Sequence, residues 1–311
     1  MVSTVKHSIY IFILSLLLSA CGQTTSTVNS TPFSSTPQPG PSASSLPPVS
    51  TAAQLQPNPT PAPLAAKVNQ EGILLAEYEA EQLRLQSGLK DVGQEMPAAD
   101  QNQTVLDELI NQVLLAQSAA QAGYQLSDAD FQKRLEALIV QTGGQAGFGD
   151  WLTRNAYTED SFRRALRRSF AAAWQRDQVA AKVPASAEQI HARQILVLNE
   201  DLAISLYAQL QAGADFATLS LKTDPDSGGE LGWFPKGYLF LPEIEQAAFE
   251  LQPGKYSPII KTSYGFHIVY VIERDPNRAL STDARTEMQR KTLNNWLKER
   301  RAQSQVEILV K

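Results

Sequence analysis

Few side chains in this 311-residue chain belong to the types that form covalent intermediates or bind metal ions. It contains one cysteine, Cys21, and three histidines. A single cysteine excludes an intramolecular disulfide and a cysteine-cluster metal site, and three histidines leave little room for a histidine-rich metal centre. The net charge of −5 argues against a nucleic-acid binder, which needs a basic face to contact phosphates.

The polar residues that could take part in a reaction lie in the last third of the chain. Asp224 lies near the start of a loop, 223–232, that carries three glycines and one proline. An Asp-Pro pair often starts a turn, so Asp224 has a structural interpretation beside the chemical one. His267 begins a strand-like segment further on, and Thr262 directly follows another.

The elements that must position these residues begin after Pro184. Periodicity and turn signals predict strands and helices in one compact α+β unit of about ninety residues. The expected strands are 189–198, 256–261 and 267–272, and the expected helices are 202–210, 216–221 and 242–249.

The preceding segment has only helical patterning. Apolar residues recur at three- and four-residue spacing from Leu75 and again from Thr104. Ser127 and Thr158 (or Glu159) are expected to start two further helices. A glycine-rich break at 143–149 is expected to precede a short helix near 151–152. Four arginines between 163 and 168 are interpreted as a solvated face with acidic partners, so this segment shows no catalytic group.

The N-terminal end reads as an export signal followed by a tether. Residues 1–20 contain Lys6, a short apolar run and two small residues before Cys21. The segment 21–66 has no charged residue and contains ten of the 18 prolines. Such a composition predicts a disordered stalk, with a proline-rich ligand for a groove-type module as the less favoured alternative.

Two sets of motifs resemble known families. Leu18-Ser19-Ala20-Cys21 is similar to the lipobox of bacterial lipoproteins, in which the cysteine carries the lipid; the alternative is an ordinary secretory signal with a buried cysteine. The segments 192–197, 214–217, 228–234, 247–249 and 265–268 resemble, in order and spacing, the parvulin peptidyl-prolyl isomerases.

The flanks of this unit resemble the SurA- and PrsA-like exported foldases. The resemblance implies an α+β parvulin domain, with about four antiparallel strands and helices, inserted between an all-α chaperone region and a C-terminal helix. The expected parts are a lipoprotein signal peptide (1–20), a tether (21–66), a chaperone domain (67–185), a parvulin domain (186–275) and a C-terminal helix and tail (280–311) that pack on the chaperone domain.

Isomerisation of an X–Pro bond requires no nucleophile, metal or cofactor, because its barrier of ~18–20 kcal/mol comes from amide resonance. A dry apolar slot and a few polar groups suffice to favour the twisted amide. The resemblance places Asp224 (or Asp226), His267 and Thr262 among the polar groups. It assigns the slot to Leu231, Ile244, Phe234 and Phe240 (or Leu239).

One position departs from the family pattern. Most active parvulins have a second histidine on the first strand, where this chain has Gln194. His191 lies three residues earlier and is expected on the opposite strand face, so it cannot substitute. Glutamine forms hydrogen bonds but does not titrate like imidazole. The isomerase activity is therefore in question even if the fold is intact.

These observations lead to a functional expectation with open alternatives. The chain is expected to be a lipid-anchored foldase on the extracytoplasmic side of a bacterial membrane, acting on unfolded, newly exported polypeptides with X–Pro bonds. The first alternative is a parvulin-fold holdase that binds clients without catalysis. The second, a surface adhesin or solute-binding lipoprotein, does not account for the motifs at 228–234 and 265–267.

Overall fold

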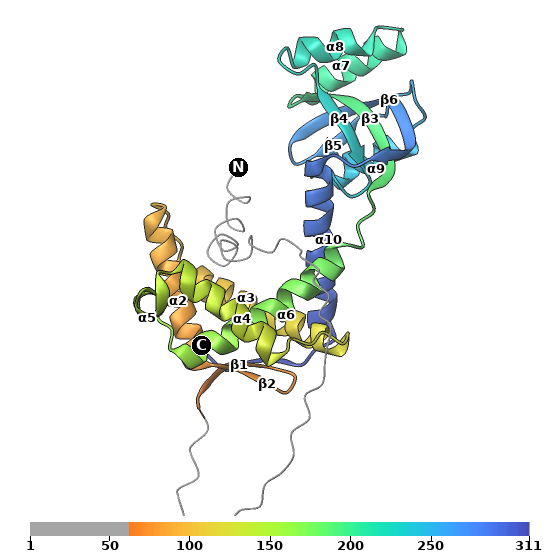
Figure 1. Cartoon of the computed structure of the whole chain (residues 1–311). Coiled ribbons are helices and arrows are strands. Elements are labelled where there is room, and N and C mark those ends of the chain that lie inside the picture. Colours follow the sequence, from red (N-terminus) through yellow and green to blue (C-terminus); the bar gives the residue numbers. More distant parts are fainter. Residues whose placement is uncertain (1–61, 311) are drawn as a thin grey trace, which may run out of the picture.

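The computed structural model of the chain describes residues 62–310 (Figure 1). The expected signal peptide, Cys21 and all but the last residues of the expected tether lie outside the described residues. The tether was expected to reach Ala66, but Ala65 and Ala66 are fully buried in a strand. The folded part therefore begins a few residues earlier than the composition indicates.

Within the described residues, five helices precede the α+β unit. They are α2 (Leu75–Asp91), α3 (Ala98–Gln121), α4 (Asp128–Gln141), α5 (Gly144–Arg154) and α6 (Glu159–Ala180). Ser127 and Thr158 cap α4 and α6, as predicted, and each side chain accepts a hydrogen bond from a backbone N–H of the first turn. These caps set the helix starts.

The glycine-rich segment differs from its prediction, because α5 begins at Gly144 instead of near Trp151. Buried Phe148 and Leu152 anchor the helix in an aromatic core. Gly147 permits this path, since a Cβ there would lie 2.0 Å from the Thr142 carbonyl oxygen. Here glycine allows α5 to pack closely against the end of α4.

The region that the sequence predicted to be all-helical also contains a small sheet. Its strands are β1 (Leu64–Val68), β2 (Glu71–Leu74) and β7 (Val306–Ile308), in the antiparallel order β2-β1-β7. Strands this short show no readable alternation, and β7 comes from the opposite end of the chain. The all-helical prediction omitted them for these reasons.

The α+β unit has the predicted four-stranded antiparallel sheet. Its order is β4-β3-β6-β5. The elements in sequence are β3 (Ser186–Val197), α7 (Glu200–Gln211), α8 (Phe216–Thr223), β4 (Glu230–Pro235), α9 (Pro242–Glu250), β5 (Ile260–Thr262) and β6 (Gly265–Ala279). The predicted strand 256–261 is mostly loop, with a single bridge between Tyr256 and Tyr270, and β6 is longer than predicted.

Each face of this sheet carries its own core. Helices α7 and α8 cover one face, and α9 lies on the other (Figure 1). Along β3, Ile195 and Val197 contact the α7–α8 side, whereas Ile190 and Ala192 belong to the core on the α9 side. Residues of even number in this part of β3 and odd number in β6 therefore face α9, and they include Gln194 and His267.

Helix α10 (Thr282–Ala302) runs from the α+β unit to the helical region (Figure 1). There Arg301 forms an ion pair with Asp107 of α3 at 2.6 Å, and Arg300 donates to Gln121 at 3.2 Å. The C-terminal segment thus contacts the helical region, as the resemblance implies. Within residues 62–310, no helix combines the length and apolarity needed to cross a bilayer.

Candidate active site

Three of the residues selected from the sequence meet on the α9 face of the sheet. The Nδ1 of His267 lies 2.8 Å from Oε1 of Gln194, and its Nε2 lies 2.9 Å from Oγ1 of Thr262. The residues come from β6, β3 and β5, which are neighbouring strands. The sheet therefore brings together segments more than seventy residues apart in sequence.

The contacts select one neutral form of the imidazole. The amide oxygen of Gln194 can only accept, so Nδ1 of His267 carries the proton, and Nε2 accepts the hydroxyl proton of Thr262. The backbone N–H of Tyr264 donates to the same hydroxyl oxygen at 3.0 Å and orients it. His267 is only 1% exposed.

Burial lowers the pKa of His267, because the charged form loses its hydration, and the nearby negative charge of Glu243 opposes this effect. Glu243 stands in the first turn of α9. The start of α9 thus lies close enough to influence the histidine.

Asp224 is arranged differently. It ends α8 and accepts hydrogen bonds from the Ser227 hydroxyl, from the backbone N–H of Ser227 at 3.2 Å and from that of Gly229 at 3.2 Å. These bonds lower the pKa of its carboxyl group, the Ser227 hydroxyl contributing most. All of them lie within its own loop, which matches the turn-forming interpretation. The alternative residue, Asp226, is exposed.

The loop reaches the histidine network indirectly. Gly229 accepts a hydrogen bond from the backbone N–H of Gln194 at 2.7 Å. A Cβ on Gly229 would lie 1.8 Å from the Gln194 carbonyl oxygen, and the φ of Gly229 is +69°. Only glycine fits this contact. Asp224 therefore holds the loop that packs against the strand of Gln194.

The apolar residues of the expected slot divide into core and surface. Ile244 and Phe234 are buried in the core on the α9 face, and Leu231 is half-buried against it. Leu239 also packs against this core, whereas Phe240 is 78% exposed and only meets the ring of Tyr264 edge to face. Of the two alternatives for this position, Leu239 is the one in contact with the core.

Two charged side chains that no sequence motif indicates hold the loop that carries Leu239. Glu245 of α9 accepts from the backbone N–H groups of Gly237 at 2.6 Å and Leu239 at 2.9 Å. From the other side, Lys291 of α10 donates to the carbonyl oxygens of Gly237 at 2.6 Å and Tyr238 at 3.2 Å. No motif indicates these contacts, because they join residues whose spacing has no periodic signal.

His191 lies away from this site, as strand alternation predicts. Its Nε2 is 2.7 Å from Glu230, and its ring stacks on Trp233 with centroids 5.3 Å apart. It makes no contact with His267 and leaves Gln194 as the partner of that histidine. Within the described residues, no group of three or more histidine, cysteine, aspartate or glutamate side chains has a metal-site arrangement.

Two parts of the chain are similar to known protein domains. Residues 181–273 match the PPIC-type PPIase domain and residues 50–175 match the SurA-like N-terminal domain. The foldase protein PrsA of Caldanaerobacter subterraneus subsp. tengcongensis is 44% identical over 89 residues, which are 27% of this chain and 29% of that protein. The chaperone SurA of Shewanella frigidimarina is 35% identical over 146 residues, 39% of this chain and 33% of that protein.

A solved structure of the peptidylprolyl isomerase PrsA from Bacillus anthracis is 25% identical and covers 63% of this chain and 89% of that chain, with a TM-score of 0.38. The chain spans less than half the length of the first curated relatives, from 29% to 46%. The chain therefore carries a PPIC-type PPIase domain at residues 181–273, which follows a SurA-like N-terminal domain.

Proposed function

We propose that the protein is a membrane-anchored, extracytoplasmic foldase that isomerises X–Pro bonds in exported polypeptides. The observation that carries the proposal is the buried His267, held between Thr262 and Gln194 on the face where Leu231 and Leu239 pack beside α9. The matches to the PPIC-type and SurA-like domains support it.

Isomerisation of an X–Pro bond requires few reactive side chains. Twisting the C–N bond removes amide resonance, so the site has to favour the twisted amide over both planar forms. Half-buried Leu231 and Leu239 can exclude water from a proline ring. The histidine network, neutral and fixed by two neighbours, supplies oriented dipoles that need no rearrangement during the twist.

The isomerase assay tests this function directly. The chain from Gly22 onward should accelerate cis/trans exchange of a proline-containing peptide, and His267→Ala should lower kcat/KM by about 10- to 100-fold because the polar network is lost. His191→Ala, on the opposite face, is the matched control and should retain the activity. A wild-type rate equal to the uncatalysed rate would refute catalysis.

The anchor has its own test. Cys21 lies outside the described residues, and the proposal for it depends on the lipobox motif. Cys21→Ser should release the protein from membranes in cell fractionation, because a lipid chain is what holds a chain of this kind at the bilayer. A variant that still fractionates with membranes would contradict lipidation.

Gln194 favours a second candidate function, a holdase that binds unfolded polypeptide without isomerising it. The glutamine fills the place of a titratable histidine and fully satisfies Nδ1 of His267, which is compatible with a purely structural network. Suppression of aggregation that persists in the double variant His267→Ala/Asp224→Ala, together with an inactive wild type, would select this function.

A further inference from the structure

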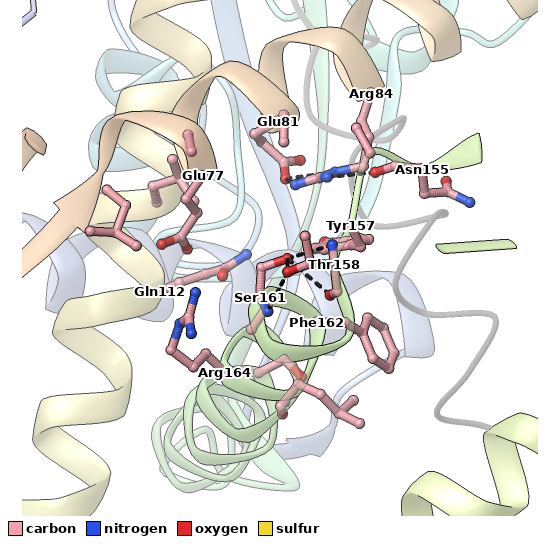
Figure 2. Close-up of a pocket in the computed structure, with 18 of the residues that line it drawn as sticks. Glu77, Glu81, Arg84, Gln112, Asn155, Tyr157, Thr158, Ser161, Phe162 and Arg164 are labelled. Carbon is pink, nitrogen blue, oxygen red and sulfur yellow. Dashed lines mark hydrogen bonds and ion pairs between the residues drawn. The ribbon is translucent and has the colours of Figure 1, made fainter. Parts of the chain in front are cut away.

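A cavity of about 290 Å³ lies in the helical region, far along the chain from the histidine network. Figure 2 shows residues from α2, α3, α6 and the turn before α6 around it. Most of its wall is apolar, and it includes Ala80, Leu85, Leu109, Phe162 and Leu166. A space of this size suits one or two side chains of a bound molecule and not a dissolved ion.

Most charges around the cavity are already neutralised by partners. Arg84 pairs with Glu81, donates to the Asn155 carbonyl at 2.8 Å and lies 4.1 Å from the centre of the Tyr157 ring (Figure 2). Glu77 pairs with Arg168 of α6. Arg164 lines the cavity and is exposed to solvent.

Glu108 of α3, unlike the exposed Arg164, is shielded from solvent, and it also forms no ion pair within the described residues. Glu108 is among the residues that line the cavity, and its carboxylate accepts a hydrogen bond from the Gln112 amide at 3.1 Å. No arginine or lysine in residues 62–310 forms an ion pair with it. Burial raises its pKa and the charge of Glu81 adds to the rise, while Gln112 and, from longer range, Arg176 act against it. A shielded carboxylate without a cation costs free energy unless a partner arrives.

We propose that this cavity binds a lysine or arginine side chain of an unfolded polypeptide, with Glu108 as the acceptor of the cation. The inference rests on the proposed handling of unfolded clients and names what the helical region recognises in them. A lysine or arginine has an aliphatic stem for the apolar wall and a charged end for the carboxylate. Charge complementarity excludes acidic side chains, and a purely apolar one would leave Glu108 unpaired.

Short proline-free peptides that differ at one central residue test the proposal. Fluorescence anisotropy with the chain from Gly22 onward should show a central lysine binding about tenfold more tightly than norleucine, which has a similar stem without the charge, a difference expected for a shielded ion pair. A central glutamate should bind least. Equal affinities for lysine and norleucine would overturn the proposal.

Two variants and a competitor locate the effect. Glu108→Gln, which keeps the shape, should erase the preference for lysine, while Glu136→Gln, an exposed glutamate of α4 outside the cavity, should keep it. Ala80→Phe should fill the cavity and abolish binding of both peptides without lowering the melting temperature. Either of two results would contradict a site for polypeptide side chains. One is unchanged peptide binding in Ala80→Phe. The other is that butylammonium, the competitor, binds as tightly as the lysine peptide.

The outcome is independent of isomerase activity. The peptides contain no proline, so a preparation without isomerase activity that still prefers lysine would refute only the catalytic proposal. A fully active isomerase that binds lysine and norleucine peptides equally would refute only the cavity site.

Discussion

The imidazole of His267 is neutral because it is buried. The stability of the folded protein therefore depends on pH. Its pKa is lowered from the ordinary 6.5, so on acidification the unfolded chain binds a proton before the folded chain does. Folding stability is therefore lost as the pH falls from 6.5 toward the folded pKa, and is fully present above 6.5.

As the pH falls, the free energy of unfolding should decrease more steeply for the wild type than for His267→Gln. Urea unfolding between about pH 7.5 and pH 5 measures it. Isomerase activity should decline over the same interval, since a protonated Nε2 cannot accept the Thr262 hydroxyl. Parallel stability curves for the two proteins would show that the histidine does not control this pH range.

Gln194 offers a gain-of-function test at the same scale. Gln194→His would place an imidazole against Nδ1 of His267, where the glutamine oxygen now accepts. If the glutamine limits catalysis, kcat/KM should rise by about tenfold, because a histidine can also exchange a proton within the network. Gln189→His on the same strand, distant from His267, is the control. An unchanged rate in Gln194→His would mean that the glutamine performs the same function.

At the scale of elements, the loop 236–241 is held between two helices. Glu245 of α9 accepts its N–H groups and Lys291 of α10 donates to its carbonyl groups. Lys291→Met keeps the stem and removes the donor, so the loop and Leu239 should become less ordered. We expect KM for a prolyl peptide to rise about three- to tenfold with little change in kcat, as the net contribution of an intact hydrogen bond is typically about 0.5–1.5 kcal/mol.

The matched control is Lys298→Met, an exposed lysine on the same helix. It should leave KM unchanged. A KM that stays at the wild-type value in both variants would show that the contact with α10 does not position the loop.

These examples separate what a sequence can and cannot reveal about the site. The resemblance to the parvulin motifs selected Gln194, Thr262 and His267, and strand alternation only placed His191 on the other face; the sheet brings the three residues together. The choice between Leu239 and Phe240 depends on the path of a loop that Glu245 and Lys291 fix from a distance, and no local pattern encodes that path. Within the α+β unit, β3, β6 and the helices are long enough to show their periods, whereas β4 and β5, like β1, β2 and β7, are too short to be read from patterning.

At the scale of the whole molecule, the main feature is that the C-terminal strand β7 lies beside β1, the first strand of the folded part. Strand β7 pairs with β1, and the Asn69 backbone N–H donates to the Gln305 carbonyl at 2.8 Å. Val306 packs against the core that holds Ala65 and Val68. The α+β unit is thus inserted between two segments of one helical region, and the last residues contribute to the stability of the first.

Removal of residues 305–311 should therefore destabilise the helical region more than the α+β unit. The lost backbone pairing and apolar contact correspond to about 2–4 kcal/mol, which lowers a melting temperature by about 5–10 °C for a region of this size. Calorimetry, with His267→Gln marking the transition of the α+β unit, can follow both regions. Glu307→Gln, which keeps the strand and changes only an exposed side chain, should melt like the wild type. If the truncated protein also melts like the wild type, β7 does not contribute to the fold; if both regions shift together, α10 couples them into one cooperative unit.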